Sequence, residues 1–143
     1  MRAFILNVFA AFLPLFCIDG ASAAESGLEM KEIKITDGEK IILTAVLNDT
    51  ETARDLYGRL PLRLEMKPLQ NREFYTDIRL SEQAPEQDSY QIGDIGYWTP
   101  GNALAIYYGP GYTGNLIIMG YVTSGLETLS KIKQRFTAVI EKN

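Results

Sequence analysis

The sequence predicts a mainly β domain whose antiparallel strands close into a barrel and carry two short helices. Apolar residues alternate with polar ones in seven or eight stretches, whereas helical spacing occurs in only two places. So many strands would leave exposed edges in an open sheet, and closure into a barrel removes those edges.

The first two strands are expected to form a hairpin. Ile33 and Ile35 alternate with polar neighbours, and the alternation resumes over residues 41–47. Between them lies Asp37-Gly38, a dipeptide that is typical of tight hairpin turns. We therefore expect two antiparallel strands joined at this dipeptide.

A first short helix is expected directly after the hairpin. Asn48 and Glu51 have the spacing of a capping box, and apolar residues follow at helical spacing over 53–60. Two more strands are then predicted at 62–66 and 74–80, on either side of a PLQN turn.

The second half of the chain supplies the remaining elements. The polar stretch 81–89 predicts a long surface loop. Ser124 and Glu127 form a second predicted capping box, ahead of a short helix with Leu126 and Leu129 on its apolar face. The remaining strands are predicted at 95–98, 104–108, 116–122 and 136–140.

Residues 1–23 are interpreted as a secretory signal peptide. Arg2 is followed by an apolar stretch over 3–18, which is too short to span a bilayer comfortably, and the small residues at 21–23 suit cleavage after Ala23. An uncleaved membrane anchor is the alternative. Cleavage leaves one domain, residues 24–143, which is expected to be periplasmic or secreted and to have no stable membrane span.

The composition excludes several classes of function. The chain has no histidine, so it has no histidine-dependent nucleophile and no histidine-bound zinc. The single cysteine, Cys17, lies in the expected signal peptide, which leaves no disulfide and no thiolate cluster. A net charge of -4 and the lack of any basic run argue against nucleic acid as a partner. We expect a monomer without metal or cofactor.

Residues 93–125 form the most distinctive part of the chain. They hold eight of the twelve glycines, five of the eight tyrosines and Trp98, the only tryptophan. Pro100 and Gly101 suit the central positions of a type II turn between two aromatic strands. Because side chains alternate along a strand, Tyr97 and Trp98 point to opposite faces, and one face presents aromatics outside the core. A half-buried aromatic hairpin without a binding role is the structural alternative.

This segment resembles the bacterial cyclophilin-like proteins. The block GDIGYWTPGNALAIYYGPG, followed by LIIMGYVTSGLETLSKI, is similar to a block that is typical of that family of small barrels. The opening stretch KITDGEKIILTAVLNDTETARDLYGRLPLRLEM is also similar, so the resemblance spans roughly residues 32–141. It implies a closed eight-stranded cyclophilin-like β-barrel with two short helices.

The resemblance does not extend to the residues that cyclophilins use as prolyl isomerases. Their groove uses an arginine in an F-H-R block, whereas this chain has FYTDI, with Thr76 at the corresponding place, and no Q-G-G block. Isomerisation needs a hydrogen-bond donor near the proline nitrogen and an apolar pocket. Arg72 or Arg79 remains as a substitute donor, so a weak or divergent peptidyl-prolyl isomerase is the alternative function.

Acid-base catalysis by carboxylates is the other enzymatic alternative. It would need two acidic side chains facing one cleft within about 5 to 10 Å. We expect structural roles instead, in turns, helix caps and an exposed ion pair. The candidates are Glu73, Asp77, Asp88, Asp94 and Glu127.

The favoured function is a binding module that holds an extended peptide or small ligand in an aromatic groove, without catalysis. Phe74 and Arg72 are two residues apart and are expected to share one face of their strand. The resemblance places this strand beside the groove, with Arg72 at the rim. Trp98 and Asn102 bracket the predicted turn, which holds them close together. Tyr107 completes the predicted ligand-binding residues.

Tyr107 is preferred to Tyr108 because of the alternation within its strand. Leu104, Ile106 and Tyr108 form the more apolar face and should enter the core, which leaves Tyr107 on the opposite face. A binding module predicts an aromatic groove without a buried charge, whereas an enzyme requires an arginine or a carboxylate pair inside it.

Overall fold

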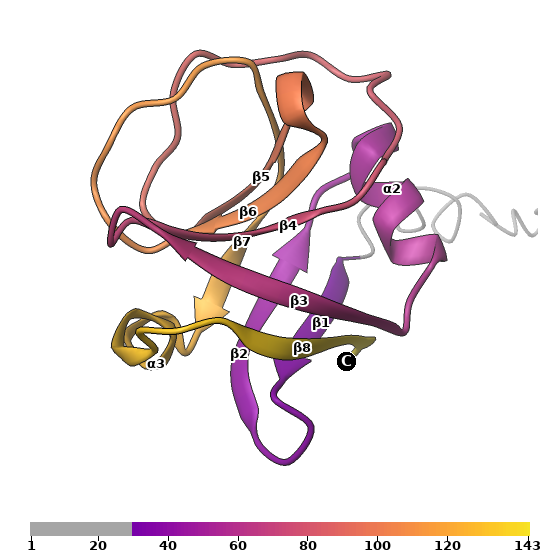
Figure 1. The fold of residues 1–143 in the computed structure, drawn as a ribbon. Coiled ribbons are helices and arrows are strands. Elements are labelled where there is room, and N and C mark those ends of the chain that lie inside the picture. The colour runs from indigo at the N-terminus through magenta and orange to yellow at the C-terminus, as the bar shows by residue number, and fades with distance from the viewer. Residues whose placement is uncertain (1–29) are drawn as a thin grey trace, which may run out of the picture.

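The computed structural model describes residues 30–143, so the predicted signal peptide lies outside the described residues. Eight antiparallel strands form a closed barrel in the order β1-β2-β7-β5-β6-β4-β3-β8 (Figure 1). The predicted mainly β class, with eight barrel strands and two short helices, is confirmed. No helix in the described part of the chain is long and apolar enough to cross a membrane.

The elements follow one another in the predicted order. The strands are β1 (Lys31–Thr36), β2 (Ile41–Leu47), β3 (Leu62–Leu69), β4 (Glu73–Asp77), β5 (Asp94–Trp98), β6 (Ala103–Tyr107), β7 (Leu116–Ser124) and β8 (Phe136–Lys142). Within residues 30–143 the helices are α2 (Glu51–Gly58), the one-turn 3-10 helix η2 (Thr99–Gly101) and α3 (Leu126–Lys131).

The β1–β2 hairpin turns at Asp37-Gly38, as predicted. Oδ1 of Asp37 accepts hydrogen bonds from the backbone N–H groups of Lys40 (3.0 Å) and Glu39 (3.1 Å), which lower the pKa of that carboxyl. Gly38 has a φ of 100°, a conformation that glycine adopts without a steric penalty.

Both helices begin differently from the predicted capping boxes. Thr50 caps α2 by accepting a hydrogen bond from a backbone N–H in the first turn (3.2 Å), while the amide of Asn48 donates to a backbone carbonyl of β7. The residue before α3 is Gly125, which has no side chain to cap with. Ser124 remains part of β7, and its hydroxyl bonds to that of Thr44 (2.6 Å). The side chains of Asn48 and Ser124, which were predicted to cap the helices, therefore form hydrogen bonds to neighbouring strands instead.

The β5–β6 connection also differs from the predicted type II turn. Residues 99–101 form the 3-10 turn η2, and the left-handed residue is Asn102, with a φ of 52°. The indole of Trp98 lies over Gly101, where an added Cβ would come within 2.5 Å of the ring. Gly101 is thus required for close contact with the indole, not for a positive φ.

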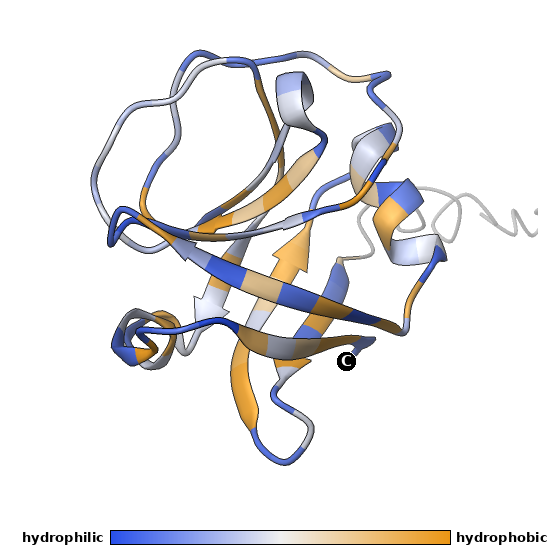
Figure 2. Cartoon of the chain, viewed as in Figure 1, coloured by the Kyte–Doolittle hydropathy of each residue, from blue (hydrophilic) through white to orange (hydrophobic). Residues whose placement is uncertain are grey.

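The barrel interior is filled by the inward-facing side chains of all eight strands. Figure 2 shows the hydrophobic residues concentrated along these strands, with hydrophilic residues in the connections. Leu56 of α2 and Leu129 of α3 are buried in the same core. Fully buried core side chains include Ile33, Ile35, Leu43, Met66, Phe74, Tyr97, Leu104 and Ile106.

Strand β6 is buried on both of its faces. Leu104 and Ile106 face the barrel interior, whereas Ala105 and Tyr107 belong to a second, outer cluster with Leu116. The long β4–β5 and β6–β7 connections pass over this part of the wall (Figure 1). A second layer therefore covers the outer wall, and the candidate site lies within it.

Candidate ligand-binding site

A cavity of about 290 Å³ lies on the outer wall of the barrel, over β4 and β6. The strand register pairs Glu73 with Tyr107 and Tyr75 with Ala105, so these outward-facing side chains are direct neighbours. The next outward residue of β6 is Ala103. Because alanine side chains are short, the wall is hollow between the larger side chains.

Trp98 forms the aromatic end of the cavity. The register pairs it with Ala103, whose neighbour on β4 is Asp77. Its side chain packs on Gly101 and the residue remains 39% exposed. An exposed indole beside a cavity is typical of a ligand contact.

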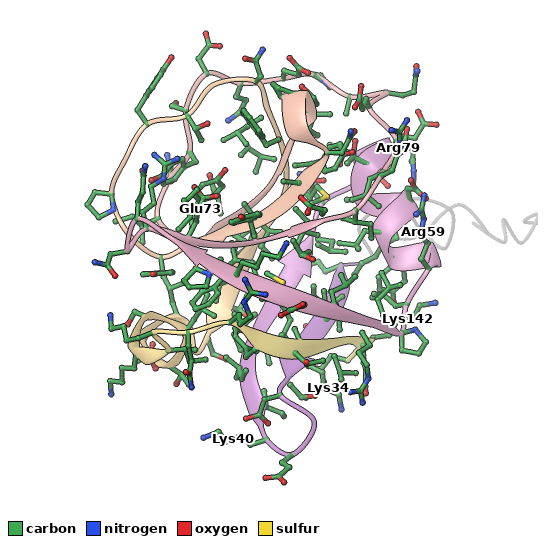
Figure 3. The ribbon with its side chains drawn as sticks, viewed as in Figure 1. Lys34, Lys40, Arg59, Glu73, Arg79 and Lys142 are labelled. Carbon is green, nitrogen blue, oxygen red and sulfur yellow. The ribbon has the colours of Figure 1, made fainter. Side chains whose placement is uncertain are left out.

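A buried ion pair forms the opposite end. Nε of Arg72 donates to Oε1 of Glu73 at 2.9 Å, and Nη1 of Arg72 donates to the backbone carbonyl of Tyr112 at 3.0 Å. Glu73 is only 5% exposed. Figure 3 shows it extending from the start of β4 toward the side on which the long loops lie.

Burial controls the ionisation of Glu73. Removal of its carboxyl from water raises its pKa above the usual value, and the hydrogen bond and charge of Arg72 act in the opposite direction. Arg72 therefore favours the ionised form of the carboxyl, which burial disfavours.

Tyr107 lies beside this ion pair. Its ring stacks on Tyr90, with the ring centroids 3.8 Å apart and the planes inclined by 16°. Burial, and then the nearby negative charge of Glu73, raise the pKa of the Tyr107 hydroxyl, which stays protonated at neutral pH.

Glycines allow the β6–β7 connection to close over Arg72. An added Cβ at Gly109 would lie 2.6 Å from the carbonyl oxygen of Asn71, and one at Gly111 would lie 2.9 Å from Cδ of Arg72. Thr113 of the same connection lines the cavity. Arg72 thus holds both Glu73 and the loop that covers the site.

Asp77, on the aromatic side, takes part in an exposed ion pair. Its carboxylate lies 3.5 Å from Nζ of Lys67, and its side chain is 68% exposed. The predicted exposed ion pair of Asp77 is thus observed, and the residue also lines the cavity.

Three of the five predicted site residues, Arg72, Trp98 and Tyr107, line this one cavity. Phe74 does not: it is fully buried in the barrel core, against Phe136 and Tyr108. The prediction for Phe74 was wrong because β4 turns its even-numbered residues inward.

Asn102 also does not line the cavity. Its Oδ1 accepts a hydrogen bond from the hydroxyl of Tyr97 (3.0 Å), and its left-handed backbone ends the η2 turn. Asparagine suits that conformation, so the residue supports the turn that carries Trp98. The placement of Asn102 in the groove is corrected to this supporting position.

The sequence prediction assigned Glu73 only a structural role and omitted Tyr75 and the two alanines. The signal available for Glu73 was the adjacent Arg72, because an acidic side chain is almost never fully buried unless it is paired. The cavity therefore combines an aromatic end with a buried charge, two properties that the sequence analysis assigned to different function classes.

Metal binding has no evident site within residues 30–143. No group of three or more aspartate, glutamate, cysteine or histidine side chains in that range is arranged to hold a metal ion.

These features define a small antiparallel β-barrel with a covered cavity on its outer wall. The Cyclophilin-like family matches residues 35–141, and the chain belongs to this family. A hypothetical protein of Archaeoglobus fulgidus, known from a solution structure, has a similar fold: the TM-score is 0.63 at 18% identity, over 80% of this chain and 95% of that chain. No curated protein matches the chain.

Proposed function

We propose that this protein is an exported binding module that recognises an extended peptide or a small ligand in the outer-wall cavity, without catalysing a reaction. The observation that carries the proposal is the pairing of an exposed indole, Trp98, with a fixed polar end at Arg72 and Glu73 in one cavity. Pockets that bind ligands typically combine an apolar lining with a few fixed polar groups.

The polar end is better suited to binding than to catalysis. Arg72 already donates to Glu73 and to a backbone carbonyl, so it is not a free charge poised for a substrate. The two cavity carboxylates, Glu73 and Asp77, are four residues apart on one strand, which separates their backbones by roughly 13 Å. Each carboxylate also has a cation of its own, Arg72 at 2.9 Å for Glu73 and Lys67 at 3.5 Å for Asp77, so neither is a free partner in a two-carboxylate mechanism.

Trp98 fluorescence tests binding directly, because Trp98 is the only tryptophan in the chain. We expect capped tripeptides, acetyl-Ala-Leu-Ala-amide and acetyl-Ala-Phe-Ala-amide, to shift its emission in a saturable way. Ala103→Leu should abolish the shift by filling the cavity floor. Tyr121→Ala, which removes an exposed aromatic outside the cavity, should retain it. An unsaturable signal, or an equal signal in the Ala103→Leu variant, would contradict the proposal.

Prolyl isomerisation remains the second candidate, because Arg72 lies inside the cavity. Thr76, which stands where cyclophilins have their arginine, is buried and does not line it. We expect no acceleration of Ala-Xaa-Pro-Phe isomerisation above background, since a well-placed donor in such a site is worth about two to three powers of ten in rate. A rate within tenfold of an authentic cyclophilin would favour the isomerase and identify Arg72 as its donor.

Export rests on the amino-terminal sequence. Arg2, the apolar stretch 3–18 and the small residues before Ala24 support cleavage of a signal peptide. When the full chain is expressed in a bacterial host, the periplasmic fraction should contain protein that starts at Ala24. Protein with an intact amino terminus in the membrane fraction would support the anchor alternative.

A further inference from the structure

The polar end of the cavity offers hydrogen-bonding atoms that the protein itself does not use. Within the described residues, Oε1 of Glu73 accepts from Arg72, whereas Oε2 of Glu73 and the hydroxyl of Tyr107 have no hydrogen-bond partner. Neither atom is sealed from solvent, because every fully buried side-chain nitrogen or oxygen in residues 30–143 has a partner. Both residues line the cavity, so these atoms are accessible through it.

The charges at this end argue against an ionic ligand group. A cation that approached Glu73 would meet the Arg72 guanidinium, whose Nε lies only 2.9 Å from the carboxylate. An anion that approached Arg72 would meet Glu73 in the same way. A neutral group avoids both repulsions and the cost of burying a further charge.

The free atoms also define the hydrogen-bonding pattern of that neutral group. The Glu73 oxygen only accepts, so it needs an N–H or O–H from the ligand, and the protonated Tyr107 hydroxyl can donate to a ligand oxygen. A secondary carboxamide carries both functions in one neutral group, and in the trans form its N–H and its carbonyl point in opposite directions. A tertiary amide, such as the bond that precedes proline, lacks the N–H.

We propose that the polar end binds a neutral amide with an N–H, such as an ordinary peptide bond: its N–H donates to Glu73, its carbonyl accepts from Tyr107, and the attached apolar group rests against Trp98. This inference deepens the proposed binding function and rests on it. It implies that the cavity prefers ordinary peptide bonds to those that precede proline.

A head-group series tests the inference. The probes share a 3-phenylpropyl body: N-methyl-3-phenylpropanamide, its N,N-dimethyl analogue, methyl 3-phenylpropanoate, 3-phenylpropanoate and 3-phenylpropylammonium, each titrated against Trp98 fluorescence. The secondary amide should bind about ten to a hundred times more tightly than the dimethyl amide or the ester, because an N–H bonded to a buried carboxylate contributes that much. Both ions should bind more weakly than the secondary amide.

A matched pair of tyrosine variants tests the role of the hydroxyl. Tyr107→Phe should weaken binding of the secondary amide about three- to tenfold without loss of thermal stability, because the hydroxyl has no hydrogen-bond partner among residues 30–143. Tyr121→Phe is the control: it removes the hydroxyl of an exposed tyrosine outside the cavity and should leave the affinity unchanged.

The outcomes separate this inference from the proposed function. Equal affinity for the dimethyl amide, tighter binding of either ion, or no binding by any probe would overturn the inference. If the capped tripeptides still shift Trp98 emission in any of these cases, the proposed binding function is retained and only the proposed recognition of an amide N–H is withdrawn. If no tripeptide binds either, both proposals fail.

Discussion

Replacement of Arg72 by methionine tests whether Glu73 depends on its ion pair. The pair is largely buried, with 18% of the Arg72 side chain and 7% of the Glu73 side chain exposed. Loss of one partner of a buried pair costs about 3 to 5 kcal/mol, because an uncompensated charge remains. Since the pair borders a cavity that admits water, we expect the lower value, about 3 kcal/mol at pH 7.5.

The same variant should recover stability in acid. The folded-state pKa of Glu73 is raised above 4.5, and the loss of Arg72 removes the interaction that opposes this shift. A raised folded-state pKa means that the native state binds the proton more tightly. The stability that protonation of Glu73 contributes is therefore complete below about pH 4.5, and it is lost as the pH rises through the folded-state pKa of Glu73. At pH 4 the deficit relative to the native protein should shrink to about 1 kcal/mol, the value of the lost hydrogen bond to Tyr112.

Thermal and urea unfolding followed by circular dichroism at pH 4 and pH 7.5 measure this difference. For a domain of this size, 3 kcal/mol corresponds to roughly 10 to 15 °C in Tm. Arg135→Met is the control, because Arg135 pairs with Glu65 at 3.1 Å on the surface and its loss should cost at most about 1 kcal/mol at either pH. An equal deficit for Arg72→Met at both pH values, or a deficit below about 1 kcal/mol at pH 7.5, would refute the reasoning.

Three other predictions concern the core, a close contact and metal independence. Ile106→Ala should lower the free energy of unfolding in urea by about 2 to 5 kcal/mol. Trp98→Ala should cost less stability and should instead weaken tripeptide binding by about 2 kcal/mol in calorimetry, and an unfolded Trp98→Ala variant would identify Trp98 as a core residue. Gly120→Ala should lower the free energy of unfolding by about 3 kcal/mol or more, because the added Cβ would lie 2.1 Å from the carbonyl oxygen of Val46. Gly58→Ala, which has open space around it in α2, should not destabilise the protein, and equal Tm values for the two variants would contradict this reasoning. A chelator should leave the Tm of residues 24–143 unchanged, and a drop of several degrees would point to a bound metal.

The alternation of apolar residues predicted the strands closely, because a barrel buries one face of each strand and that burial fixes the pattern. The predicted strand at 95–98 is observed at 94–98, and that at 104–108 is observed at 103–107. The same pattern did not reveal that β6 is buried on both faces. That burial comes from Tyr90 and the long connections, which contact the wall from positions distant in sequence.

The errors within the site arise at a turn. Arg72 and Phe74 were placed on one face because they are two residues apart, but alternation applies only inside a strand. Gln70 and Asn71 both have positive φ, and β4 begins at Glu73, so Arg72 still belongs to the turn. Its side chain therefore lies on the same outer side as Glu73, while Phe74 enters the core. Sequence spacing alone could not show where the turn ends.

The pairing of β8 has a consequence for how the protein reaches this fold. Strand β8, the last along the chain, is bonded to both β1 and β3, and Ile35 lies across from Ile140. The hairpins β1–β2, β3–β4 and β5–β6 are local and form at a small cost in loop entropy, whereas β8 must join a partner from the far end of the sequence. Until β8 docks, β1 and β3 each present an unpaired edge to other chains. The docking of β8 therefore closes both of these edges at once, at the very end of synthesis.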